Sequence, residues 1–196
     1  MSLYRTAALL LGGCSLFFGT PHSQSIVDSD TLVGHPAAHH VGPPQLYPNP
    51  SLTPGQAETV GLDDLTDRWE CPASMHKVDC TYSQAHRSVS KKTHTKVYEE
   101  YQIPESKRNA KNGEVDHFDP LCNGGSNDIE NLWYQPAKNM WNGKNFGYHE
   151  KDALESWVCT QVKAGKLDPQ EAFTKITSDW VKFYVDVNPK HSKSAE

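Results

Sequence analysis

An acidic side chain and an imidazole stand side by side near the middle of the sequence, at Asp116 and His117. A carboxylate is a hard oxygen ligand for a divalent cation. A neutral imidazole can accept a proton from water near pH 7. Asn131 opens the next apolar run, and its amide could ligate a metal or orient the imidazole. These residue types together predict metal-assisted hydrolysis of a phosphodiester.

The acid and the imidazole need a strand–loop–strand unit to hold them. Apolar residues flank the pair, which predicts a short strand that ends near His117. Gly124 and Gly125, followed by small polar residues, predict the connecting loop. Residues 132–134 are apolar and aromatic, so we expect them to form the returning strand.

Ahead of this unit, three short elements are expected. Residues 63–69 predict a helical turn, residues 87–90 a strand, and residues 92–101 a helix that ends before a proline.

Behind the unit, two helices are expected. Residues 148–164 place apolar side chains on one face at helical spacing. The last helix begins at Asp168 as its N-cap, with Pro169 at its first position and a capping box completed by Glu171. Its apolar stripe predicts core packing, and no cofactor is needed to explain it.

The N-terminus resembles an export signal over residues 1–25. Arg5 supplies its positive end, residues 7–18 its apolar core and residues 23–25 a cleavage site with small side chains. The apolar run is too short to span a membrane as a helix. The alternative is a lipoprotein anchored at Cys14, in which case the protein would be attached to a membrane.

The rest of the chain divides into three parts. Residues 26–61 are rich in proline and glycine and predict a largely disordered linker, with the alternative that residues 48–55 are ordered against the domain. Residues 62–187 are expected to form one folded domain, and residues 188–196 a polar tail.

The formal charge of −5 is unusual for a nucleic-acid-binding protein. Basic residues are nevertheless concentrated just before the Asp116–His117 pair, where they could contact phosphates. A solvated surface is the alternative interpretation of these side chains. The candidate nucleic-acid contacts are Lys91, Lys92, Lys107 and Arg108.

Cysteine usage indicates an oxidising compartment. The chain has five cysteines, and removal of Cys14 with an export signal would leave four, an even number. Four cysteines allow three pairings, and the residues by themselves do not choose among them. A zinc site is the other possible use, but the chain lacks a closely spaced cysteine pair.

Around the Asp116–His117 pair the chain resembles the HNH endonucleases, and the resemblance extends almost continuously over residues 101–180. Asp119 and Cys122 depart from the pattern, because an apolar side chain is usual at both positions. The stretch from Asn131 to His149 is also longer than in the common pattern of these endonucleases. The residues that carry the resemblance are Asp116, His117, Pro120, Leu121, Gly124, Gly125, Asn127, Asp128, Asn131, Leu132, Trp133, His149, Glu150, Lys151, Asp152, Leu154 and Glu155.

This resemblance implies an α+β fold whose core is the ββα-metal unit, with flanking helices. It implies an exported endonuclease that hydrolyses DNA, with RNA as the alternative, and that uses Mg, Mn or Zn and no small-molecule cofactor. His117 would be the general base, Asp116 a metal ligand, His149 the second protein ligand, and Asn131 a ligand or the residue that orients His117. Glu114 and Lys151 are candidate supporting residues.

The resemblance also implies a disulfide pairing of Cys80 with Cys159 and of Cys71 with Cys122. A secreted or periplasmic location follows from the export signal.

Two further classes of function compete with the endonuclease. One is a catalytically inactive module that keeps the fold and binds nucleic acid or a surface. The other is a lipoprotein with an adhesive role, which depends on Cys14 alone. Retention of Asp116, His117 and Asn131 together favours the enzyme, because a binding module needs no acid–imidazole pair.

Overall fold

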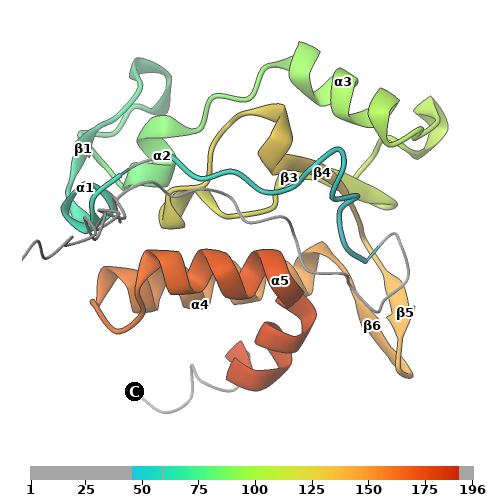
Figure 1. Ribbon diagram of the computed structural model, residues 1–196. Helices are drawn as coiled ribbons and strands as arrows, with labels where there is room; N and C mark the ends of the chain where they lie inside the picture. The colour runs from blue at the N-terminus through green and yellow to red at the C-terminus, as the bar shows by residue number, and fades with distance from the viewer. Residues whose placement is uncertain (1–45, 59, 190–196) are drawn as a thin grey trace, which may run out of the picture. The chain divides into compact units, whose positions relative to one another are not determined.

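The computed structural model describes residues 46–58 and 60–189, and this part of the chain is an α+β protein (Figure 1). The predicted export signal over residues 1–25, the linker residues 26–45 and the end of the tail from residue 190 lie outside the described residues. Within the described residues, no helix is both long enough and apolar enough to cross a membrane.

Short helices and paired strands precede two longer helices. The helices are α1 (Leu62–Thr66), α2 (Tyr82–His86), α3 (Lys91–Glu100), α4 (Tyr148–Lys163) and α5 (Pro169–Val187). The antiparallel strand pairs are β1 (Trp69–Glu70) with β2 (Asp79–Cys80), β3 (Gly113–His117) with β4 (Leu132–Pro136), and β5 (Asn139–Trp141) with β6 (Lys144–Phe146).

The β3–β4 hairpin confirms the predicted strand–loop–strand unit. His117 is the last residue of β3 and pairs with Leu132, the first residue of β4. The connection contains the one-turn 3-10 helices η3 (Leu121–Asn123) and η4 (Ile129–Asn131). Gly124 has a φ of 90°, a left-handed conformation that glycine adopts without strain.

The predicted strand over residues 87–90 is wrong, because these residues form a loop. The amide of Ser88 donates to the side chain of Asn127 at 3.2 Å rather than to another strand. Ser90 is already the N-cap of α3, and its hydroxyl accepts a hydrogen bond from the Thr93 amide. Ser88 and Ser90 therefore form hydrogen bonds with a side chain and with a helix N-terminus, and not with a neighbouring strand.

The last helix begins as predicted. The carboxylate of Asp168 accepts from the amides of Gln170 and Glu171, and Pro169 occupies the first helical position. The predicted capping box is incomplete, because the Glu171 side chain does not bond back to the Asp168 amide. The Glu171 carboxylate instead pairs with Lys175 at 2.6 Å.

The core lies where α4 and α5 pack on one another and on the β3–β4 hairpin (Figure 1). The predicted apolar faces of both helices are buried, because burial of such faces drives helix packing. The buried side chains that α4 and α5 contribute include Leu154, Val158, Val162, Phe173, Ile176, Trp180 and Phe183.

Residues 46–58, which we expected in the linker, are part of the folded domain. Leu46 and Tyr47 belong to the core. Tyr47 donates to Asp179 at 2.6 Å, where α5 is interrupted by a non-helical residue, and Trp180 donates to the Leu46 carbonyl at 2.9 Å. Thr53 is fully buried and donates to the Leu132 carbonyl at 2.7 Å. The folded domain therefore begins before the predicted start at residue 62.

Candidate active site

Asp116 and His117 are neighbours in sequence but serve opposite faces of β3. Successive side chains of a strand point to opposite sides of the sheet. The Asp116 carboxylate reaches Lys151 on α4. His117, together with Val115 and Leu132, lines a cavity on the other face. The two consecutive residues therefore face different surroundings. Asp116 belongs to a charged cluster on one face of β3, and His117 lines a cavity on the other face.

Lys151 is the centre of the charged cluster. Its ammonium group lies 3.1 Å from Asp116 Oδ2, donates to the His117 carbonyl oxygen at 2.6 Å, and contacts the Glu155 carboxylate. The side chain is fully buried. Burial alone would lower the pKa of Lys151, but Asp116 and Glu155 outweigh it and hold the pKa above its ordinary value. Lys151 therefore stays charged and joins the end of β3 to α4.

Burial and neighbouring negative charge also act on Glu114, on the same face of β3 as Asp116. Burial, followed by the charges of Asp116 and Asp152, raises the pKa of Glu114 to about 7. Lys151 and Arg87 act in the opposite direction. Neighbouring carboxylates such as these mark a place where an added cation would be stabilised.

His117 is a buried, neutral imidazole. Its exposed fraction is 4%, and burial is the main cause that lowers its pKa to about 4, against the opposing effect of Asp116. At neutral pH the ring is therefore uncharged, and this is the form that accepts a proton.

Asn127 determines which nitrogen of His117 carries the proton. The Asn127 amide nitrogen donates to the His86 carbonyl at 2.8 Å, so its oxygen is the atom that faces His117 Nε2 at 3.2 Å. An amide oxygen only accepts, so Nε2 must carry the hydrogen. Nδ1 forms no hydrogen bond within the described residues and keeps its lone pair. Sequence reasoning missed this role of Asn127, which we named only among the residues that carry the resemblance.

Asn131 holds the loop rather than the imidazole or a metal. Its amide oxygen accepts from the Asp119 amide at 2.9 Å, and its amide nitrogen donates to the carbonyls of Asp119 and Ser126, also at 2.9 Å. The side chain is fully buried. Because its hydrogen-bonding groups are engaged by the backbone, the ligand role predicted for Asn131 does not fit this geometry.

The backbone that Asn131 holds also requires glycine at position 125. A Cβ atom at this position would lie 1.9 Å from the Asp119 carbonyl oxygen and 3.0 Å from the Asn131 amide nitrogen. Any side chain at position 125 would therefore displace the backbone that Asn131 holds.

Within the described residues, no hydrogen bond or ion pair joins His149 to Asp116 or Asn131. His149 is exposed in the first turn of α4, with its ring 4.2 Å from the Tyr148 ring. In the part of the chain that the structure describes, no three His, Cys, Asp or Glu side chains are grouped closely enough to hold a metal ion. Asp116 remains the best candidate ligand, because only one of its oxygens contacts Lys151.

The predicted phosphate contacts fall in two places. Lys91 and Lys92 are exposed in the first turn of α3, next to the cavity. Lys107 is exposed in a short 3-10 helix. Arg108 donates to the Ile103 carbonyl at 2.9 Å and lies 5.3 Å from the Tyr98 ring centroid, so it has a structural role.

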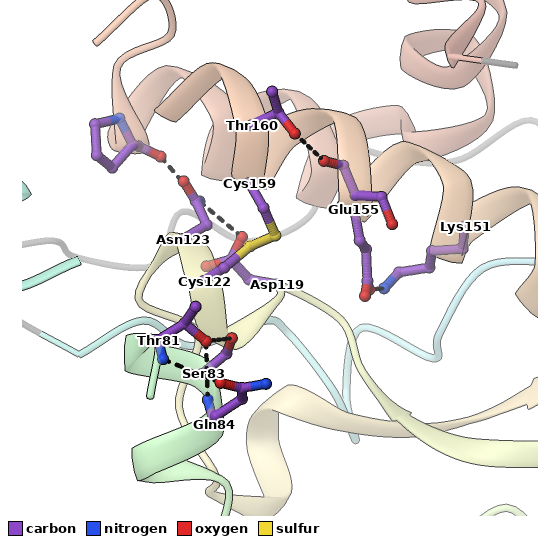
Figure 2. The surroundings of a disulfide bond; sticks show 12 residues. Thr81, Ser83, Gln84, Asp119, Cys122, Asn123, Lys151, Glu155, Cys159 and Thr160 are labelled. Atoms are coloured by element: carbon purple, nitrogen blue, oxygen red, sulfur yellow. Dashed lines mark hydrogen bonds and ion pairs between the residues drawn. A yellow bond between two sulfur atoms is a disulfide. The ribbon is translucent and has the colours of Figure 1, made fainter. Parts of the chain in front are cut away.

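The disulfides differ from the predicted pairing. Cys71 is bonded to Cys80, and Cys122 to Cys159. The first bond closes a short loop between β1 and β2. The second ties η3 to α4, close to Lys151 and Glu155 (Figure 2).

Asn123 adds two further ties at the same place. Its amide nitrogen donates to Asp119 Oδ1 at 2.9 Å and to the Pro169 carbonyl at 3.0 Å (Figure 2). Asp119 is fully buried, and burial raises its pKa well above the ordinary value. The loop that follows His117 is thus fixed to both long helices.

Neither a family model, nor a curated protein, nor a solved structure matches the chain.

Proposed function

We propose that the chain is an exported, metal-dependent endonuclease of the HNH type, which hydrolyses phosphodiester bonds of DNA, with RNA as the alternative substrate. The observation that supports this proposal most is the state of His117. The imidazole is neutral, its Nε2 is held by Asn127, and its Nδ1 is left to accept a proton. A general base needs this arrangement, whereas a module that only binds does not.

Each neighbour of His117 has a role in this proposal. His117 Nδ1 takes the proton from the attacking water. Lys151 pairs with the Asp116 carboxylate and fixes the end of β3 against α4. Asn131 holds the loop that follows His117 in place.

The neighbouring carboxyl groups of Glu114, Asp116 and Asp152 fit a divalent cation. Asp116 would hold this cation, with His149 as the proposed second ligand from α4. A bound Mg, Mn or Zn ion would stabilise the charge on the phosphate and on the leaving oxygen.

Export is part of the proposal. The two disulfides are compatible with an extracellular or periplasmic location. The signal over residues 1–25 would direct the chain there, with lipidation of Cys14 as the alternative.

A plasmid-cleavage assay tests the proposal. The parent protein should nick plasmid DNA with Mg, Mn or Zn and lose this activity when a chelator is added. His117→Ala should lower turnover by roughly 10²–10⁴-fold, the usual range for a general base. Asp116→Ala should instead weaken metal binding, measured by calorimetry, and recover part of its activity at high metal concentration.

The matched control is His76→Asn. His76 is exposed and has a φ of 49°, a conformation that asparagine accepts. This variant should cleave like the parent. If the parent binds DNA but cuts it with none of the three metals, the inactive binding module becomes the better interpretation.

A further inference from the structure

A cavity of about 410 Å³ lies on the face of β3 opposite Lys151. Its wall is formed by the loop that precedes α3, by the first turn of α3 and by the ends of β3 and β4. The lining residues are Arg87, Ser88, Val89, Ser90, His94, Val115, His117 and Leu132. His117 is thus shared between the proposed catalytic chemistry and the cavity.

The lining has a polar part and an apolar part. Val89, Val115 and Leu132 form an aliphatic surface. Arg87 is exposed, and within the described residues it forms no salt bridge. An exposed guanidinium beside an aliphatic surface suits a ligand with both an anionic and an apolar end.

The start of α3 points to an anion. Helix N-termini favour negative charge, yet the first turn of α3 has no acidic residue and contains Lys91 and Lys92. This placement is unfavourable for the helix by itself. It becomes favourable if a phosphate group lies near the free amides and the two ammonium groups.

The size of the cavity indicates a ligand larger than a phosphate group. Cavities of roughly 300–1,000 Å³ hold whole small molecules, and this one falls in that range. A phosphate alone would leave the aliphatic surface uncovered. A nucleotide would cover it with its sugar and base.

We propose that this cavity holds one nucleotide of a single-stranded nucleic acid, with its phosphate at Arg87 and the first turn of α3 and its sugar and base against Val89, Val115 and Leu132. This rests on the proposed function, because it places the neighbouring phosphodiester beside His117. A base inside a duplex is stacked and paired, so it can enter such a cavity only after it leaves the stack. A single strand meets no such cost. The proposed nuclease should therefore prefer single-stranded substrates.

Binding of a mononucleotide tests the cavity without any cleavage. Thymidine 5′-monophosphate should shift the NMR signals of Val89, Val115 and His117. It should bind more tightly than thymidine or inorganic phosphate, because each of these carries only part of the ligand. Equal binding of monophosphate and inorganic phosphate, or shifts confined to other residues, would overturn the proposal.

Arg87→Gln should weaken monophosphate binding by roughly 10-fold or more, as expected for loss of a charge-assisted hydrogen bond. Arg68→Gln is the matched control, because Arg68 is exposed and does not line this cavity. Ser88→Trp should fill the cavity and block the monophosphate while the Ser88 amide keeps its bond to Asn127. Unchanged binding in both Arg87→Gln and Ser88→Trp would contradict the proposal.

Cleavage separates this inference from the proposed function. With matched oligonucleotides, the single strand should be cut faster than the duplex, and Arg87→Gln should raise KM more than it lowers kcat. Cleavage without monophosphate binding in the cavity would overturn the nucleotide site and leave the nuclease. Monophosphate binding at these residues without any cleavage would support the nucleotide site and overturn the proposed nuclease activity.

Discussion

The Asn127 side-chain oxygen lies 3.2 Å from His117 Nε2, and this contact sets the tautomer of the proposed general base. The same oxygen accepts from the Ser88 amide at 3.2 Å, while the amide nitrogen is held by the His86 carbonyl. Asn127 therefore joins the β3–β4 connection to the loop that lines the cavity. Its side chain positions His117.

Replacing Asn127 by alanine should lower turnover by roughly 10–100-fold, the usual effect of losing a partner that orients a functional group. Metal affinity should change little, because Asn127 holds no proposed ligand. Nitrogen-15 NMR of the imidazole should also show His117 shifting from the Nε2–H tautomer to a mixture of both. Asn145→Ala, an exposed change on β6, is the control. An unchanged tautomer in Asn127→Ala would contradict this role.

The protonation of His117 should affect stability in a definite direction. Its pKa is about 4 in the folded protein and about 6.5 in an unfolded chain. Between these values the unfolded state binds more protons, so the free energy of unfolding rises with pH. The contribution is complete above pH 6.5 and is lost as the pH falls through 4. At 1.36 kcal/mol per pH unit it amounts to at most about 3 kcal/mol.

Urea unfolding of the parent and of His117→Gln at pH 7, 5.5 and 4 measures this contribution. The parent should lose more stability than the variant as the pH falls. Glu114, whose pKa is raised to about 7, acts in the opposite direction in both proteins, so the comparison removes most of its effect. A charged His117 imidazole at pH 5.5, seen by NMR, would refute the expected shift.

Removal of Lys151 should be costly because it leaves the half-buried carboxylates of Asp116 and Glu155 without their partner. Lys151→Met should lower the free energy of unfolding by about 3–5 kcal/mol, the range for breaking a buried ion pair from one side. The double variant Lys151→Met, Glu155→Gln should recover part of this loss. Urea unfolding measures both.

Lys175→Met provides a matched control for Lys151→Met. Lys175 pairs with Glu171 at the same four-residue spacing as Lys151 and Glu155, but both partners are exposed. Its loss should cost about 0.5 kcal/mol or less. Similar losses for Lys151→Met and Lys175→Met would show that burial of Lys151 contributes little.

Much of the fold could be predicted because local patterns are consistent with it. Apolar residues around His117 and the glycines after it were enough to indicate the β3–β4 hairpin. Asp168 and Pro169 marked the start of α5 by the chemistry of helix N-termini. These features depend on neighbours in sequence.

The remaining features depend on contacts between distant segments. Nothing in the loop composition distinguishes Asn127 from its polar neighbours, because its role follows from how the loop returns toward His86. Lys151 is a charged residue whose burial is explained only by Asp116, 35 residues earlier. Tyr47 lies in a proline-rich segment but packs against α5. Cysteine spacing likewise left three pairings open.

The two disulfides should differ in their effects when each is removed by a double change to serine. They enclose separations of 37 residues for Cys122–Cys159 and 9 for Cys71–Cys80. Loop-closure entropy predicts losses of about 4 and about 2.5 kcal/mol, respectively. Loss of the Cys122–Cys159 bond should also lower plasmid cleavage more than loss of the Cys71–Cys80 bond, because Cys122–Cys159 ties η3 to α4, the helix that carries Lys151. Non-reducing peptide mapping should show these two bonds, and urea unfolding with plasmid nicking should rank the variants. If loss of the Cys71–Cys80 bond impairs cleavage equally, the tie between η3 and α4 has no special role at the site.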